Sequence, residues 1–93
     1  MIKVVRTLSN LMIIGEVNES EHLIDIKKPY SMLPQAEGIE LFPLDSGLLG
    51  KELDEITMLR TVIIYTTEAS QVLKEYYEKA SSSTLAQPQI ITG

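Results

Sequence analysis

The sequence predicts a small, mainly β domain with one C-terminal α-helix, and three observations lead to this fold class. The chain has 93 residues, enough for one domain but not for two. Short apolar stretches follow one another from residue 2 to residue 66, with tight polar turns between them. The hydrophobic period then changes from two to about 3.6, as expected where strands give way to a helix. We expect the strands to form a small antiparallel barrel or sandwich, because a lone two-stranded ribbon is not stable.

The first three predicted strands lie before residue 29. Ile2–Arg6 is apolar-rich, and Leu11–Val17 is rich in β-forming residues. Gly15 lies inside the second stretch, where a glycine usually marks a bulge or a close backbone approach. Leu23–Lys28 alternates apolar and polar side chains, which is typical of a half-buried strand.

The remaining strands are interrupted by proline and by one long connection. An extended pattern resumes over Tyr30–Leu33 after Pro29, which is typical of a strand end or edge. Ile39–Leu44 alternates again and forms the fourth strand. Asp45–Asp54 contains two glycines and mixed charges, so we expect a loop. Glu55–Thr66 is the strongest strand region and completes a set of five.

A stripe of apolar side chains at helical spacing predicts a helix over about residues 68–80, consisting of Ala69, Val72, Leu73, Tyr76 and Ala80. Thr66 or Thr67 can cap it, and Glu68 and Lys79 would lie at the ends where the helix dipole favours their charges. We therefore expect a single domain over residues 1–80. Residues 81–93 are expected to form a C-terminal tail, in which residues 88–92 dock as an extended segment on this sheet or on a neighbouring chain.

Composition and charge exclude several classes of protein. The chain has no cysteine, which excludes a disulfide scaffold and a cysteine-based metal site. No apolar run approaches the ~18 residues of a membrane span, so no membrane partner is expected. The net charge is −5, which argues against broad nucleic-acid binding. Residues 37–55 carry six carboxylates and one lysine, so this segment accounts for the whole net charge.

No constellation of residues in the chain indicates catalysis or a cofactor. Ser46–Lys51 has two residues between its glycines, whereas a phosphate-binding P-loop needs four. The carboxylates of Glu52, Asp54 and Glu55 do not have the spacing of a calcium loop and are typical of a solvated acidic loop. His22, the only histidine, lies in a turn without other ligands at metal-binding spacing. We therefore expect no enzyme activity, no metal and no cofactor.

Basic residues in the strand regions offer two interpretations. Lys27 and Lys28 are close in sequence to Tyr30, and Arg60 lies in the last strand region. A basic strip with an aromatic ring can neutralise and stack single-stranded RNA. Lysines on an edge strand also deter unwanted strand pairing, and this second interpretation is the one we favour.

The order of the strands and two short patterns resemble the Sm-like superfamily, which includes the Sm, LSm and Hfq proteins. The first Sm signature corresponds to Ile13–Val17 with its central glycine, the turn Asn18–His22 and the triplet Ile24–Ile26. The second corresponds to Leu59–Thr61, followed by the apolar strand Val62–Ile64. The resemblance spans about residues 2–66, and the C-terminal helix is similar to that of small Sm-like proteins carried by tailed phages of marine bacteria.

The resemblance implies a strongly bent, five-stranded antiparallel open barrel. In the family, a late strand of one subunit pairs with an edge strand of the next and closes a ring. The resemblance therefore implies a homo-oligomeric ring of about five to seven subunits, with an interface strand formed by Val62, Ile63, Ile64 and Tyr65.

Departures from the family pattern guide the functional expectation. Asp25 stands where the family has a base-contacting asparagine, and Thr61 replaces the glycine of the second signature. We therefore expect a non-enzymatic, cytoplasmic ring that acts as an interaction or virion-associated module, with the chain itself and another protein as partners. The alternative is a ring that binds RNA or single-stranded DNA through Lys27, Lys28, Tyr30 and Arg60.

Overall fold

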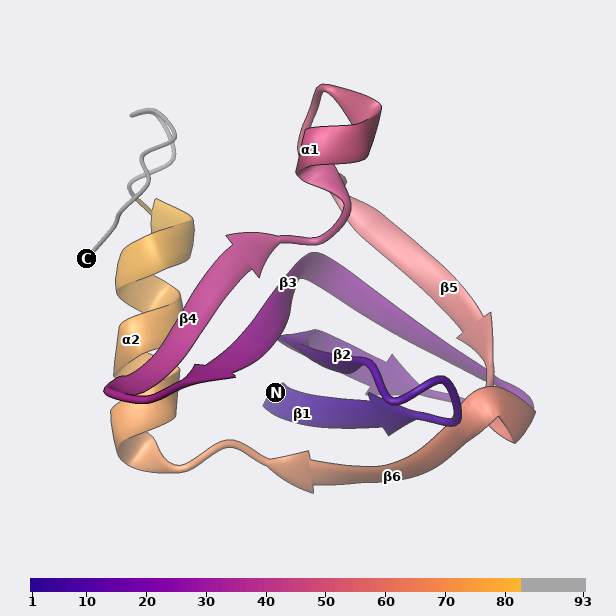
Figure 1. Cartoon of the computed structure of the whole chain (residues 1–93). Helices are drawn as coiled ribbons and strands as arrows, with labels where there is room; N and C mark the ends of the chain where they lie inside the picture. The colour runs from indigo at the N-terminus through magenta and orange to yellow at the C-terminus, as the bar shows by residue number, and fades with distance from the viewer. Residues whose placement is uncertain (83–93) are drawn as a thin grey trace.

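The computed structural model describes residues 1–82. These residues form six strands, two α-helices and one 3-10 turn (Figure 1). The elements in chain order are β1 (Ile2–Thr7), β2 (Met12–Glu19), β3 (Leu23–Gln35), β4 (Gly38–Pro43), α1 (Ser46–Leu49), β5 (Glu55–Leu59), the 3-10 turn η1 (Arg60–Val62), β6 (Ile63–Glu68) and α2 (Gln71–Ser82). The predicted segment 88–92 lies outside the described residues.

All strands belong to one antiparallel sheet with the order β4-β3-β2-β1-β6. The long strand β3 pairs with β2 along one edge and with two strands along the other. On that second edge, the first half of β3 pairs with β5 and the second half pairs with β4. The sheet is open, with β6 at one end and β4 and β5 at the other. The mainly β class and the C-terminal helix are therefore confirmed. The sheet has six strands rather than the predicted five, because η1 divides the region 55–66 into β5 and β6.

A bulge bends β2 and β3 together near the middle of the sheet. Ile14 pairs with Tyr30 and Glu16 with Lys27, so β3 carries one extra residue at this point. Lys28 is the residue of this bulge that leaves the extended conformation, with a φ of 50°. Gly15 lies opposite, and a Cβ placed there would come within 2.6 Å of Ile26 Cγ2 and 2.8 Å of the Lys27 carbonyl oxygen. The close approach expected at this glycine is therefore present.

Two hydrophobic clusters lie on opposite faces of the sheet. Val4 and Ile14 belong to the first cluster, which α2 covers, while their neighbours Val5 and Ile13 belong to the second. This division follows from the alternation of side chains along a strand. The second cluster is enclosed by β1, β2, β3, β5 and β6, and its buried members are Val5, Ile13, Val17, Ile24, Ile26 and Leu44.

Helix α2 begins three residues later than predicted and ends two residues later. Thr66, Thr67 and Glu68 belong to β6, so the predicted cap and first-turn anion were wrong. Ser70 caps the start of the helix instead, since its side-chain oxygen accepts a hydrogen bond from the Leu73 N–H. Lys79 is in the last turn as expected. Ser81 and Ser82 extend the helix into the predicted tail.

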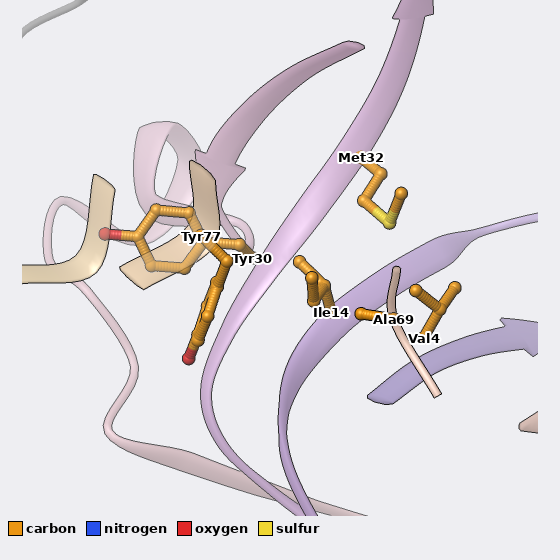
Figure 2. Close-up of a cluster of buried hydrophobic side chains, with 6 residues drawn as sticks. All are labelled: Val4, Ile14, Tyr30, Met32, Ala69 and Tyr77. Atoms are coloured by element: carbon orange, nitrogen blue, oxygen red, sulfur yellow. The ribbon is translucent and has the colours of Figure 1, made fainter. Parts of the chain in front are cut away.

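The buried face of α2 also differs from the predicted stripe. Tyr77 is buried, with Leu73 and Ala80 half-buried beside it, whereas Val72 is 77% exposed. Figure 2 shows the Tyr77 ring next to that of Tyr30, and the ring centroids lie 5.6 Å apart in an edge-to-face arrangement. The Tyr77 hydroxyl donates to the Lys28 carbonyl at 2.8 Å, and the Tyr30 hydroxyl donates to the Ala80 carbonyl at 3.4 Å. The two tyrosines thus join α2 to the bulge of β3.

Candidate functional site

Three strands have only one partner among residues 1–82. β6 pairs only with β1, and β4 and β5 pair only with β3. Each therefore presents a row of backbone N–H and C=O groups along its other edge. Such edges are templates for pairing with another chain. The candidate functional site is therefore an interaction surface formed by strand edges and their neighbouring side chains.

The predicted interface strand lies at the β6 edge, and most of its side chains are exposed. Ile64 is 55% exposed, and Val62 and Tyr65 are also exposed. Ile63 instead points inward and packs against the second cluster. The Leu8 N–H donates to the Val62 carbonyl at 2.9 Å, so the exposed Leu8 lies near the start of β6 on the side that faces β1. We refer to Val62, Ile64 and Tyr65 as the β6 apolar group.

A shallow hollow of about 100 Å³ lies along β6, and it is lined by Ile24, Arg60, Ile63, Ile64, Tyr65 and Thr66. Its position beside the edge strand matters more than its size. A volume of this order accommodates a single side chain rather than a small-molecule substrate, whose pockets are typically about 300–1,000 Å³. The hollow is therefore too small to hold a substrate of that size.

Arg60, one of the predicted nucleic-acid contacts, is held by an ion pair within the chain. Its Nη1 donates to Glu19 Oε1 at 2.7 Å, and Lys3 Nζ donates to Glu19 Oε2 at 2.9 Å. Thr66 also donates to this carboxylate, at 3.4 Å. The hydrogen bonds from Lys3 and Arg60 lower the pKa of Glu19 below its usual value. One carboxylate thus forms ion pairs with two of the basic residues of the strand regions.

Lys27 and Lys28 are exposed on the bend of β3, and Lys27 has acidic residues as its cross-strand partners. Lys27 is the register partner of Glu16 on β2 and of Glu55 on β5. Opposite charges in such cross-strand positions attract one another. Lys28 follows in the left-handed conformation, and its N–H donates to the Asp54 carbonyl at 2.8 Å.

Tyr30 is buried in the first cluster with only 5% of its surface exposed. Its ring packs on Tyr77, and burial raises the pKa of its hydroxyl. The ring is therefore not presented for stacking on a base in this conformation. The structure does not bring the four predicted nucleic-acid contacts to one face, because Arg60 lies at the β5–β6 turn, the lysines at the bend of β3, and Tyr30 inside.

Helix α1 carries an exposed leucine pair that the sequence analysis missed. Leu48 is 84% exposed and Leu49 is also exposed. The turn is ordered by its own hydrogen bonds, since Leu48 and Leu49 donate to the Asp45 carbonyl and Gly50 donates to that of Ser46. Figure 1 shows α1 projecting from the sheet near the start of β5. The sequence signal for this helical turn is a pair of leucines between Asp45 and Gly50. In the structure, Asp45 and Gly50 adopt the left-handed conformation at the two ends of the turn.

The acidic segment 37–55 surrounds this leucine pair. Asp45 and Glu52 are exposed on either side of it, and Lys51 is the one cation of the segment. A second unpaired apolar set lies on the outer face of α2, where Val72 and the exposed Tyr76 are one helical turn apart. Neither set packs into the two clusters of the fold.

Residues 1–82 contain no group of three or more histidine, cysteine or acidic side chains arranged to hold a metal ion. No helix in this part of the chain is long and apolar enough to cross a membrane. In comparisons with known proteins, no family model and no curated protein matches the chain.

Proposed function

We propose that the chain is a non-enzymatic, Sm-like subunit that assembles with copies of itself into a ring. The ring presents a surface to another protein, as a cellular interaction module or as a part of a virion. The observation that carries this proposal is the position of the unpaired edges. β6 lies at one end of the sheet and β4 and β5 lie at the other, so two different edges can meet between identical subunits.

Pairing of β6 in one subunit with β5 in the next brings apolar surface together. In an antiparallel arrangement, the end of β5 lies beside the start of β6. Leu59 ends β5, and with its exposed cross-strand partner Leu23 it would contact the β6 apolar group of the neighbour. Contact between two different edges is head-to-tail, and such interfaces generate rings when the rotation closes.

The bends and turns of the chain support the Sm-like part of the proposal. β2 and β3 bend sharply where Gly15 meets the bulge, as the first signature leads us to expect. Arg60 lies in the turn that separates the last two strands, in the position of the basic residue in the second signature. The chain differs from the family in placing its helix after the sheet, where α2 covers the first cluster.

Three features favour a protein partner over RNA. The Arg60 guanidinium is paired with Glu19, and the Tyr30 ring is buried. The exposed segment 37–55 is strongly acidic and repels phosphate. The nucleic-acid alternative therefore requires Glu19 to release Arg60 and Tyr77 to release Tyr30, which are two of the four residues that would bind.

The proposal is tested by light scattering and native mass spectrometry of the purified chain at micromolar concentration. We expect a closed oligomer, and we expect Ile64→Lys to convert it into a monomer of 10.4 kDa, because an edge lysine deters strand pairing. Leu33→Lys is the matched control. Leu33 is also an exposed apolar residue, but it lies on the half of β3 that pairs with β4 and not on β5 or β6, so the oligomer should persist. A wild-type chain that is monomeric under these conditions contradicts the proposal.

A further inference from the structure

We infer that α1 of one subunit docks on the outer face of α2 of the next, so that a second contact reinforces the strand pairing between copies of this chain. This inference rests on the proposed ring. It concerns two apolar sets that the fold of one subunit leaves exposed, the Leu48–Leu49 pair on α1 and the Val72–Tyr76 pair on α2.

The topology places these two sets at the same end of the proposed interface. Five residues separate α1 from β5, and Figure 1 shows α1 near the start of that strand. α2 follows β6 after only two residues. If β5 of one subunit runs antiparallel to β6 of its neighbour, the start of β5 lies beside the end of β6. The α1 of one copy is then brought toward the first turns of α2 in the other.

The charges around the two sets are complementary. Asp45 and Glu52 flank the leucines of α1. On α2, Lys79 continues the stripe of Val72 and Tyr76, since it lies three residues beyond Tyr76 on the same side of the helix. Glu75, which lies beside this stripe, accepts a hydrogen bond from Gln71. An apolar pair with acidic neighbours thus faces an apolar pair with a cation at its end.

The shape of α1 favours such a contact. Its three internal backbone hydrogen bonds hold the leucines in one turn, so little order is lost when they dock. Leu44 is buried in the second cluster and fixes the beginning of the segment to the sheet. The leucine pair is therefore presented in a defined position relative to β5.

Disulfide trapping tests this inference directly, because the chain has no cysteine of its own. The double variant Leu48→Cys/Val72→Cys is oxidised with diamide and analysed on a denaturing gel without reductant. We expect a ladder of covalent oligomers whose largest member equals the ring. The control is Leu48→Cys/Glu78→Cys, since Glu78 is exposed on another side of α2 and should give no ladder. A disulfide needs Cα atoms within about 7 Å, so the pair reports close contact.

The outcomes separate this inference from the ring itself. A ring seen by light scattering with no excess cross-linking of Leu48→Cys/Val72→Cys over the control overturns the α1–α2 contact and leaves the ring standing. A monomer by light scattering overturns both. Cross-linking within one chain, seen as a monomer of altered mobility, also overturns the contact between subunits.

A second variant measures the strength of the contact. Leu48→Ser/Leu49→Ser should raise the concentration at which the oligomer dissociates by about tenfold or more, because two exposed apolar side chains lose their buried partners. Gly47→Ala is the control on the same turn, where an added Cβ meets no atom within 4 Å. An unchanged dissociation concentration in the serine variant contradicts the inference.

Discussion

The hydroxyl of Tyr77 donates a 2.8 Å hydrogen bond to the carbonyl oxygen of Lys28, which lies 49 residues earlier in the chain. This bond joins the C-terminal helix to the residue that absorbs the bulge of β3. Tyr30 returns the contact by donating to the Ala80 carbonyl of the helix. The bend in the sheet and the docking of α2 are therefore one structural unit.

Tyr77→Phe should destabilise the protein by about 1 kcal/mol, because it removes this hydrogen bond and keeps the ring that packs on Tyr30. Urea unfolding at a fixed protein concentration measures the change. Tyr76→Phe is the matched control, since Tyr76 is exposed on the adjacent position of α2. Equal stabilities of the two variants would argue that the bond contributes nothing.

The pKa of Tyr77 predicts a loss of stability at alkaline pH. Burial raises it from 10.0 to about 12. Because the unfolded state ionises first, this contribution is fully present below about pH 10 and is lost as the pH rises toward 12. Unfolding measured between pH 9 and 12 should show a steeper decline for the wild type than for Tyr77→Phe. Parallel curves would contradict the assignment.

Gly15→Ala should destabilise the protein by about 1–3 kcal/mol, the usual cost of overpacking. The added Cβ would lie 2.6 Å from Ile26 Cγ2 and 2.8 Å from the Lys27 carbonyl oxygen, so β2 and β3 must move apart. Gly47→Ala changes the same residue type where no atom lies within 4 Å. Its effect on urea unfolding should stay within about 0.5 kcal/mol.

Glu19→Gln should reduce the dependence of stability on acidic pH. The native pKa of Glu19 lies below 4.5, so its contribution is present above that pH and is lost as the pH falls through the native value. Thermal unfolding between pH 3 and 7 should therefore change less in Glu19→Gln than in the wild type. Glu21→Gln, which alters a highly exposed neighbour, should leave the wild-type profile unchanged.

Labelled oligo(U) and oligo(A) should not bind the wild-type oligomer at about 50 mM salt, where phosphate contacts are strongest. The expected cause is the pairing of Lys3 and Arg60 with Glu19. Fluorescence anisotropy measures the binding. Salt-dependent binding that Arg60→Ala abolishes would establish the nucleic-acid alternative in place of the protein-interaction module.

Periodicity predicted most strands, because each one buries one face and alternates accordingly. Pro29 was predicted to interrupt the pattern between Leu23–Lys28 and Tyr30–Leu33, yet both stretches belong to the single strand β3, whose residue Lys28 leaves the regular conformation to make the bulge. This bulge places Tyr30 in the cluster under α2, whereas Ile26 lies in the cluster on the other face. A local pattern does not reveal that exchange of faces, so the sequence does not show that Tyr30, a residue of the nucleic-acid alternative, is buried.

The start of α2 was misplaced because tertiary pairing outweighed local capping signals. Thr66, Thr67 and Glu68 have the composition of a helix start, but they pair with Val5, Val4 and Lys3 of β1. The ladder of hydrogen bonds and the neighbouring clusters outweigh a preference worth about 1 kcal/mol. For a related reason the exposed leucine pair on α1 was missed, and Val72 and Tyr76 were placed in one stripe with residues that are partly buried, since hydrophobicity alone does not say which apolar residues a small fold leaves outside.

The pairing of β1 with β6 also has a consequence for how the chain folds. β1 pairs with β2 early in the chain, but residues 3–7 find their second partner strand only at residues 63–68, so the sheet cannot be completed until nearly all of the described chain has been made. Val4 and Val5 contribute to the two clusters from adjacent positions of β1, so both clusters depend on this late event. Contacts between such distant residues slow folding. During synthesis, the apolar faces of the first strands therefore stay incompletely covered until the last strand emerges.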